Sequence, residues 1–213
     1  MQSKKEIKII LIEHKEWLQN SLKGKRANLS SADLRSANLS FADLRCADLS
    51  SADLSYANLR FTNLSYANLS YADLRCVDLS YADLSYADLR SADLSFANLS
   101  SVDLSYANLS YADLSYANLS FANLSYANLS YADLRCAKTD DVFVAISCIG
   151  SRKDSTIFNV TKDIIWCGCY TGNLQDFEKR VEETHKDNLQ FLKEYRGAIT
   201  YFKTFIITEE KVK

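Results

Sequence analysis

Residues 77–96 read VDLSYADLSYADLRSADLSF, which is four consecutive copies of one five-residue unit. The same unit fills residues 27–136 without insertion or deletion, so the array holds 22 copies. We number the five positions of a unit as slots one to five. Slot three is leucine in all 22 units, and slot one is alanine in 19 of them. Such regular internal repeats are typical of solenoids, in which each unit packs against its neighbours.

The five-residue spacing excludes both a continuous helix and a straight strand. In an α-helix each leucine would advance about 140° beyond the one before it, and in a straight strand successive leucines would alternate between faces. Within one unit, however, slots one and three share a face, because strand side chains alternate. A turn in every unit keeps all leucines on the inside, so the pattern predicts a parallel solenoid with a leucine core.

The other three slots are expected to form the corners and the surface. Slot two holds twelve Asp and ten Asn, which suit corners because their side chains bond nearby backbone groups. Slot four holds sixteen Ser and six Arg, which we expect to face solvent. Slot five holds ten Tyr, four Phe, five Ser and three Cys, and its aromatic side chains are expected to point outward.

These A(D/N)LSx units resemble the pentapeptide repeat proteins. The resemblance implies a right-handed, four-sided parallel β-helix with four units in each coil, and therefore about 5.5 coils for this array. At about 4.8 Å between stacked strands the rod would be roughly 26 Å long. Slot five is a departure, since small or polar residues are common there in the family and this chain has 14 aromatic residues among 22.

Different modules are expected on each side of the array. Residues 1–26 should form a capping helix, because apolar residues recur at helical spacing over 4–20. Residues 137–213 predict a small α+β module whose strands lie between about 142 and 167: one strand over 142–149, a turn over 150–155 and a second strand over 164–169. Helices are expected over 174–186, with Asn173 as N-cap, and over 188–207, with a break near Gly197. This tail is similar to those of uncharacterised bacterial and phage members of the family.

Charge and composition disfavour several classes of protein. Formal charge is +4 over residues 1–26, −6 over 27–136 and 0 over 137–213, without the basic stripe of a nucleic-acid-binding protein. The apolar run over 7–12 is short and contains Lys8, which disfavours a signal peptide or a membrane span. We expect a cytoplasmic protein whose six cysteines are reduced.

Candidate metal and catalytic residues are few. Cys148, Cys167, Cys169 and His185 could be combined into a zinc site, but Cys-Gly-Cys lacks the two-residue gap of zinc knuckles. Cys169 and His185 as a nucleophile and base would lack an orienting group and an oxyanion site. His14 lies on an apolar helix stripe and is expected to be a packed, hydrogen-bonded side chain. The sequence predicts no metal, no cofactor and no catalytic residue.

Taking every fourth unit sorts slots two and five into ladders of stacked side chains. We expect two aromatic ladders to form a partner-binding surface: Tyr66, Tyr86, Tyr106 and Tyr126 in one, and Phe41, Phe61, Tyr81 and Phe121 in the other. One acidic ladder contains Asp33, Asp53, Asp73, Asp93, Asp113 and Asp133. Repulsion between its stacked carboxylates should raise some of their pKa values, although Arg35, Arg75 and Arg135 share that ladder.

The favoured function is a non-enzymatic protein-interaction scaffold, whose partner is an unidentified protein or a second copy of the chain rather than a nucleic acid or membrane. The resemblance implies an alternative, in which the rod imitates DNA and protects or inhibits a type II topoisomerase such as gyrase. Charge disfavours that alternative, since one net charge per roughly 4 Å is far below the one per ~1.7 Å of duplex DNA. Enzymatic activity in the C-terminal module is a third, weaker hypothesis.

Overall fold

The computed structural model describes residues 4–140, 143–149, 154–167 and 170–210. These residues divide into two compact units, one containing α1 and nearly all of the repeat array, the other containing the C-terminal module. The elements in chain order are α1 (Lys4–Gln19), the repeats, β1 (Phe143–Ile149), β2 (Asp154–Asn159), β3 (Ile164–Cys167), β4 (Tyr170–Gly172), α2 (Leu174–His185) and α3 (Leu189–Glu210).

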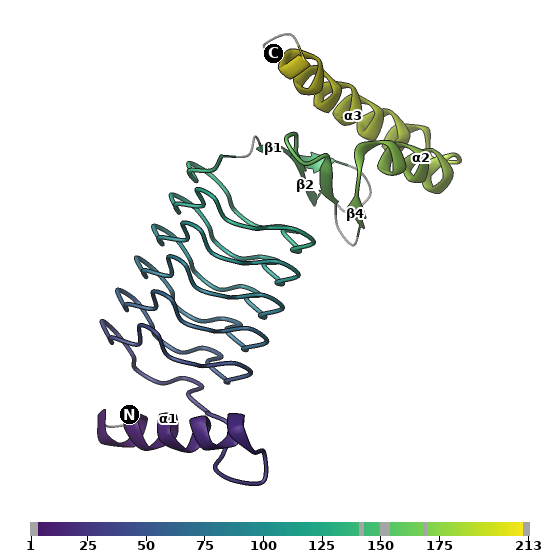
Figure 1. The fold of residues 1–213 in the computed structure, drawn as a ribbon. Coiled ribbons are helices and arrows are strands. Elements are labelled where there is room, and N and C mark those ends of the chain that lie inside the picture. The colour runs from purple at the N-terminus through teal and green to yellow at the C-terminus, as the bar shows by residue number, and fades with distance from the viewer. Residues whose placement is uncertain (1–3, 141–142, 150–153, 168–169, 211–213) are drawn as a thin grey trace. The chain divides into compact units, whose positions relative to one another are not determined.

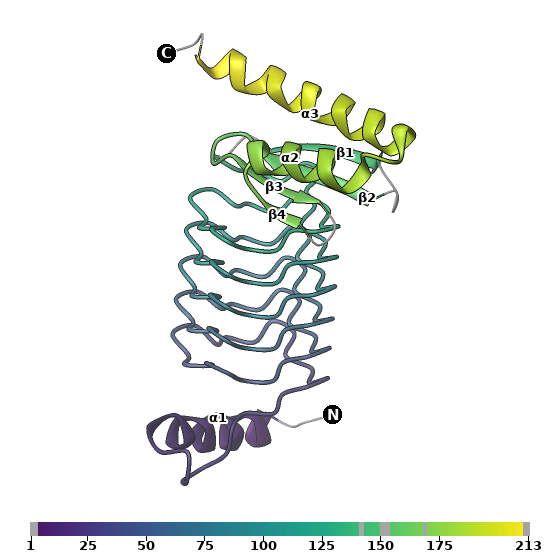
Figure 2. The same ribbon diagram turned by 90° about the vertical axis from the view of Figure 1, so that its right-hand side faces the viewer.

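The repeat array winds into coils of 20 residues. Parallel β-bridges join slot-two residues that are 20 apart, as between Asp83 and Asp103. The amide of Leu84 donates to the carbonyl of Asp103 at 2.7 Å, and the amide of Asp103 donates to the carbonyl of Ala82 at 3.0 Å. Each coil therefore contains four units and satisfies its backbone groups on the coils above and below it (Figures 1 and 2).

A tight turn at slots four and five closes every unit. The amide of Ala87 donates to the carbonyl of Leu84 at 3.1 Å, and the slot-five residue has φ between 55° and 62° in all 22 units. A positive φ at the third residue of a four-residue turn is the type II pattern. This conformation costs a residue other than glycine about 1–2 kcal/mol, so the pairing between coils must offset it in every unit.

The leucine core is confirmed. Of the 22 slot-three leucines, 21 are buried and Leu134 is half-buried. The slot-one residues lie beside them, and Val77, Val102 and Thr62 are all buried where they replace alanine. The hydroxyl of Thr62 donates to the carbonyl of Leu59 at 2.6 Å, so this polar side chain is satisfied inside the core.

The expectations for slots two and four need correction. Slot two lies in the bridged strand position rather than at the corner, although its side chain does bond the backbone: the amide of Ser80 donates to Asp78 Oδ1 at 3.1 Å. The hydroxyl of Ser80 donates to the same oxygen at 2.7 Å. This contact folds the small side chain against the coil, and nine of the sixteen slot-four serines are buried instead of facing solvent.

Helix α1 lies against the first coil (Figure 1). His14 is fully buried, and its Nδ1 accepts the amide of Ala27, the first repeat residue, at 3.1 Å. Its ring also stacks on Trp17 at a centroid distance of 5.6 Å. The chain returns through Gly24, whose φ is +67° and where a Cβ would lie 2.1 Å from the carbonyl oxygen of Glu13. Glycine is therefore required at this close approach.

The C-terminal module is an antiparallel sheet in the order β1-β2-β3-β4, with two helices. Phe158 on β2 meets Phe202 on α3 at 5.1 Å between ring centroids, and Phe177 of α2 meets Tyr195 of α3 at 6.1 Å. Two ion pairs join the helices, Arg196 with Glu182 and Lys203 with Glu178, both at 2.6 Å. Aromatic packing and these surface pairs hold the helices to the sheet and to each other.

The structure corrects part of the expected C-terminal module. The sequence pattern missed β2 and β4, and the segment expected as a turn already belongs to β2 at Asp154 and Ser155. Helix α3 passes through Gly197 without a break, because the adjacent Ala198 and Ile199 are buried in the core and hold the helix. The N-cap at Asn173 is confirmed, since its side chain accepts the amide of Asp176 at 2.7 Å.

Candidate interaction surfaces

The tyrosine ladder consists of parallel rings one coil apart. Tyr66 and Tyr86 stack at 4.8 Å, Tyr86 and Tyr106 at 4.7 Å, and Tyr106 and Tyr126 at 4.8 Å between ring centroids. Residues 20 apart occupy equivalent places on successive coils, so the coil spacing itself sets the ring spacing. All four rings are exposed, and Tyr86 and Tyr106 in the middle of the stack keep 47% and 48% of their surface. Ring edges and hydroxyl groups therefore remain accessible.

The phenylalanine-containing ladder is divided in two. Phe41 stacks on Phe61 at 5.0 Å and Phe61 on Tyr81 at 5.1 Å, but Ser101 occupies the next position. Phe121 lies beyond this gap and is 79% exposed. A shorter stack of Phe96 on Tyr116 at 4.8 Å, on another side of the rod, was not among the expected site residues.

The acidic ladder is half neutralised by its own arginines, three against six aspartates. Arg35 lies 2.7 Å from Asp33 and 3.6 Å from Asp53 on the next coil. Arg75 likewise lies 2.5 Å from Asp73 and 3.8 Å from Asp93. Near the other end of the ladder, Arg135 contacts Asp133 at 2.5 Å, and the charge of Asp113 also acts on it.

The expected rise in carboxylate pKa values within this ladder is wrong for three residues. Hydrogen bonds from the side chain of Arg35 lower the pKa of Asp33 to about 2. Hydrogen bonds from Arg75 and Arg135 lower the pKa values of Asp73 and Asp133 in the same way. A guanidinium two residues away favours the charged carboxylate more than stacked carboxylates disfavour it.

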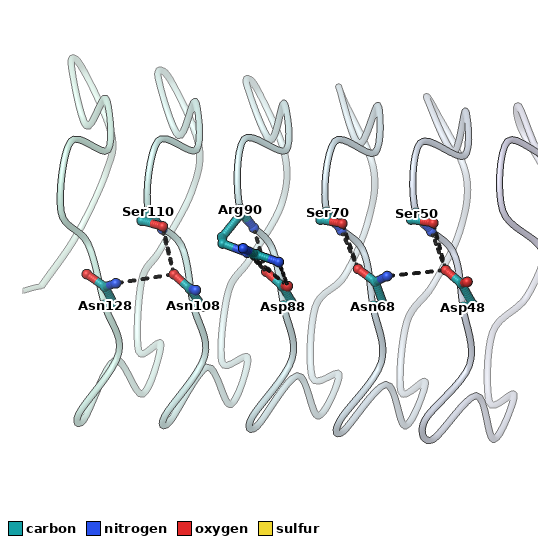
Figure 3. Close-up of polar contacts among 9 residues, drawn as sticks. All are labelled: Asp48, Ser50, Asn68, Ser70, Asp88, Arg90, Asn108, Ser110 and Asn128. Carbon is teal, nitrogen blue, oxygen red and sulfur yellow. Dashed lines mark hydrogen bonds and ion pairs between the residues drawn. The ribbon is translucent and has the colours of Figure 1, made fainter.

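Amide side chains relieve repulsion on the side shown in Figure 3. Asn68 donates through Nδ2 to Asp48 at 3.3 Å, and Asn128 donates in the same way to Asn108 at 3.3 Å. Asp88 is held by Arg90 at 2.6 Å. Amide hydrogen bonds thus join two pairs of successive coils on this ladder, and its second carboxylate is paired with an arginine.

The candidate metal and catalytic residues are not brought together within the part of the chain that the structure describes. The side chain of Cys148 and all of Cys169 lie outside the described residues. The sulfur of Cys167 accepts the hydroxyl of Thr156 at 3.1 Å, and His185 stacks on Tyr195 at 5.0 Å. Burial lowers the pKa of His14, although the nearby Asp43 carboxylate opposes the shift. The contacts of His14 and His185 show that both side chains are packed against neighbouring residues.

No described helix is long and apolar enough to cross a bilayer. Among the described residues, no group of three or more His, Cys, Asp or Glu side chains is arranged to hold a metal ion. None of the described cysteines 46, 76, 136 and 167 forms a disulfide.

Solved structures with similar repeats come from several sources. The chain is similar to a pentapeptide repeat protein of the Arabidopsis thaliana thylakoid lumen, with 36% identity over 48% of this chain and 71% of that one, and a TM-score of 0.47. A pentapeptide repeat protein from the cyanobacterium Cyanothece 51142 has 26% identity, coverages of 61% and 95%, and a TM-score of 0.33. QnrB1, a plasmid-mediated fluoroquinolone resistance protein, has 22% identity, coverages of 57% and 68%, and a TM-score of 0.41.

No curated protein matches the sequence. The family described as pentapeptide repeats matches in eight copies, over residues 25–45, 42–80, 72–105 and 103–137. Together these matches cover more than half of the chain, and the 20-residue coil with its leucine core accounts for the pattern they detect. The chain belongs to the pentapeptide repeat family.

Proposed function

We propose that this protein is a non-enzymatic scaffold that binds another protein through the aromatic ladders of its β-helix. The observation that carries the proposal is the exposure of the tyrosine ladder. Stacking covers the ring faces, yet Tyr86 and Tyr106 keep close to half of their surface. An aromatic surface that remains open after its own packing is complete is the kind of surface that protein interfaces cover.

Energetics support a role beyond self-packing. A stacked aromatic pair contributes about 0.5–1.5 kcal/mol, while each slot-five residue carries a left-handed backbone that costs about 1–2 kcal/mol. Serine occupies the same backbone conformation at Ser101 without ring contacts. The fold does not require an aromatic ring in this slot, so the concentration of rings favours recognition. Tyrosine is also enriched among the residues that dominate binding energy.

The proposal includes the organisation of the rod. We propose a right-handed, four-sided β-helix of about 5.5 coils, with residues 1–26 and 137–213 acting as caps, because an uncovered coil would offer unpaired strand edges to other chains. We also propose a cytoplasmic location, a reducing compartment in which the cysteines would stay as thiols. The partner is a different protein or a second copy of the chain.

A second candidate is the protection or inhibition of a type II topoisomerase by imitation of DNA. The net charge of −6 on residues 27–136 favours it. The arginines of the acidic ladder oppose it, because Arg35, Arg75 and Arg135 contact the carboxylates that would imitate phosphates. The two functions differ in salt dependence: a charge-based mimic would lose affinity for purified gyrase steeply as salt rises, and an aromatic interface would not.

The test compares two double variants with the same chemical change. Tyr86→Ser with Tyr106→Ser removes the middle of the ladder, and Tyr71→Ser with Tyr111→Ser removes two exposed tyrosines from a side where serine also occupies the slot at 31, 51 and 91. Sedimentation equilibrium measures self-association, and affinity capture from cell extract measures the partner. We expect both to weaken in the first variant and to persist in the second. If both persist in the first variant, the ladder only stabilises the rod.

A further inference from the structure

One pair of carboxylates on the rod has no cation. Asp83 and Asp103 are bridged neighbours on successive coils. Five other bridged pairs of aspartates exist within residues 27–136, and each includes a carboxylate contacted by a slot-four arginine. Neither Asp83 nor Asp103 forms an ion pair within the described residues. Two of the array's six uncompensated negative charges therefore lie side by side here.

Other aspartate pairs on the rod indicate which group would bind between Asp83 and Asp103. Arg35 reaches Asp33 at 2.7 Å and Asp53 at 3.6 Å, and so bridges two coils with one guanidinium. At Asp83 and Asp103 the corresponding slot-four residues are Ser85 and Ser105. Both serines are too short to reach the next coil, so the position that an arginine fills elsewhere on the rod is open to solvent.

One oxygen of each carboxylate is already used, which leaves the other for a ligand. Asp83 Oδ1 accepts the amide and the hydroxyl of Ser85 at 2.9 Å and 2.6 Å. Asp103 Oδ1 accepts the amide of Ser105 at 2.9 Å and Asn123 Nδ2 at 3.1 Å. These bonds orient both carboxylates, and their Oδ2 atoms project one coil apart, at about 4.8 Å. Two acceptors at this spacing suit the fork of one guanidinium.

Aromatic rings stand on both sides of Asp83, while Ser101 and Tyr106 flank Asp103 on the next coil. Tyr81 precedes the unit of Asp83 and Tyr86 ends it, and both rings are exposed. The combination occurs complete elsewhere on the rod, where the guanidinium of Arg60 lies 5.5 Å from the ring centroid of Phe61 and 3.8 Å from Asp78. Arginine is stabilised by this pairing of a carboxylate with an aromatic face.

We infer that the side carrying Asp83 and Asp103 binds an arginine side chain of a protein partner, with the guanidinium across both carboxylates and its stem between the flanking tyrosines. The inference rests on the proposed scaffold function and names the chemistry of its partner as a basic, arginine-containing segment. Charge complementarity selects this occupant over a second copy of the chain, because the array is itself acidic.

A labelled hexa-arginine peptide tests the site, with binding to the full chain measured by fluorescence anisotropy at low ionic strength. Asp83→Asn with Asp103→Asn keeps the hydrogen-bonding shape, since asparagine occupies ten of the 22 slot-two positions. We expect binding to weaken at least about tenfold, as for removal of paired interface charges. The matched control, Asp48→Asn with Asp113→Asn, changes the net charge equally on two other sides and should lose about twofold or less.

A second variant fills the site from within the chain. Ser85→Arg places a guanidinium beside Asp83 and Asp103, as Arg35 is placed beside its two carboxylates, and uses a residue that the repeat accepts in six of its slot-four positions. It should weaken peptide binding by at least as much as the double asparagine variant does. Ser95→Arg adds the same charge beside Asp93 and Asp113 and should leave binding largely intact. Hexa-lysine should bind more weakly than hexa-arginine, because its ammonium groups lack the fork.

Equal weakening by both asparagine pairs would overturn the inference, since binding would then follow net charge alone. Unchanged binding in Ser85→Arg would overturn it as well. These outcomes are distinct from failure of the scaffold function: partner capture that is lost with Tyr86→Ser and Tyr106→Ser, but survives in Asp83→Asn with Asp103→Asn, keeps the scaffold and removes the arginine site.

Discussion

The repeat array and the C-terminal module bury apolar side chains by different rules. In the array, every leucine meets equivalent residues 20 positions away, and the same amide-to-carbonyl bonds recur in each coil. In the module, Phe158 meets Phe202 across 44 residues, and no spacing recurs. A periodic core can be located by counting along the chain, whereas a non-periodic core requires knowledge of how helices and strands meet.

The two regions should also differ in how far the effect of a destabilising substitution extends. A solenoid unit depends mainly on its nearest coils, while the module has a single core shared by its sheet and both helices. We therefore expect substitutions in the module to unfold it as a whole and substitutions in the array to act over neighbouring coils. The four predictions below test this contrast.

Phe202→Ala should have the largest effect, about 3–5 kcal/mol, because it removes a fully buried ring from the centre of the module. Trp166 is fully buried in the module and Trp17 lies on α1, so a Trp17→Phe background leaves one fluorescent reporter of the module. Urea unfolding followed by Trp166 emission should shift strongly, while the circular dichroism of the array changes little. A parallel shift of both signals would show that the two regions unfold together.

Leu84→Ala should cost about 2–5 kcal/mol, because it opens a cavity in the middle of a core to which each coil contributes four buried leucines. Urea melts followed by circular dichroism measure the loss. Leu134→Ala is the matched control, since this leucine is only half-buried at the last unit, and it should cost clearly less. A loss below about 1 kcal/mol for Leu84→Ala would be inconsistent with a leucine that points into a packed core.

Docking of α1 should weaken as pH falls. Burial holds the pKa of His14 below its usual value, so the folded state favours the neutral form. The Asp43 carboxylate and the backbone of Arg45 oppose this shift, while the charges of Arg26 and Arg45 add to it. The stabilisation is complete above the unfolded pKa near 6.5 and is lost as pH falls through the lower folded value. Protonation of Nδ1 removes the bond to Ala27, worth about 0.5–1.5 kcal/mol.

Trp17 emission follows this transition, since its ring stacks on His14. His14→Asn is the control, because an asparagine oxygen can accept the same amide without titrating between pH 7 and 4. The wild type should show a transition below pH 6.5 that the variant lacks. An identical titration in both proteins would assign the change to other groups.

Ser101→Gly should give the smallest effect, a gain of about 0.5–1 kcal/mol, because glycine adopts the φ of 56° without steric cost. Asp163, in the module, has a similar φ of 51°, but its side chain accepts the amide of Leu174 at 3.0 Å. Asp163→Gly should therefore bring no gain. Thermal melts measure the stability of both variants. If the left-handed backbone of slot five carried no strain, Ser101→Gly would bring no gain either.

The candidate site was predictable where it followed the period. Tyr66, Tyr86, Tyr106 and Tyr126 stack because they are 20 residues apart, and that spacing is visible in the sequence. The pairing of Arg35 with two carboxylates was visible only as a shared ladder, and its effect on the pKa of Asp33 depended on side-chain geometry. The open pair at Asp83 and Asp103 required knowledge of which arginines reach the next coil.

The fold was predictable to the same degree. A leucine at every fifth position determines, by itself, that the chain turns once per unit and buries the leucine of every unit. The strands β2 and β4 left no comparable signal, because they are short and only their pairing with β3 stabilises them. Gly197 suggested a helix break from its low intrinsic propensity, but the buried residues on either side of it in the core outweigh that local preference.

Sequence alone thus determined the coil, its core and the stacking of side chains, because a fixed period repeats one local solution 22 times. The tertiary structure decided the burial of the slot-four serines, the packing of α1 on the first coil through His14, and the balance of charge on each side of the rod. Those features depend on which side chains reach across coils. Whether a side chain contacts the next coil depends on its length and on the direction in which it points, and the direction cannot be read from its position in the sequence.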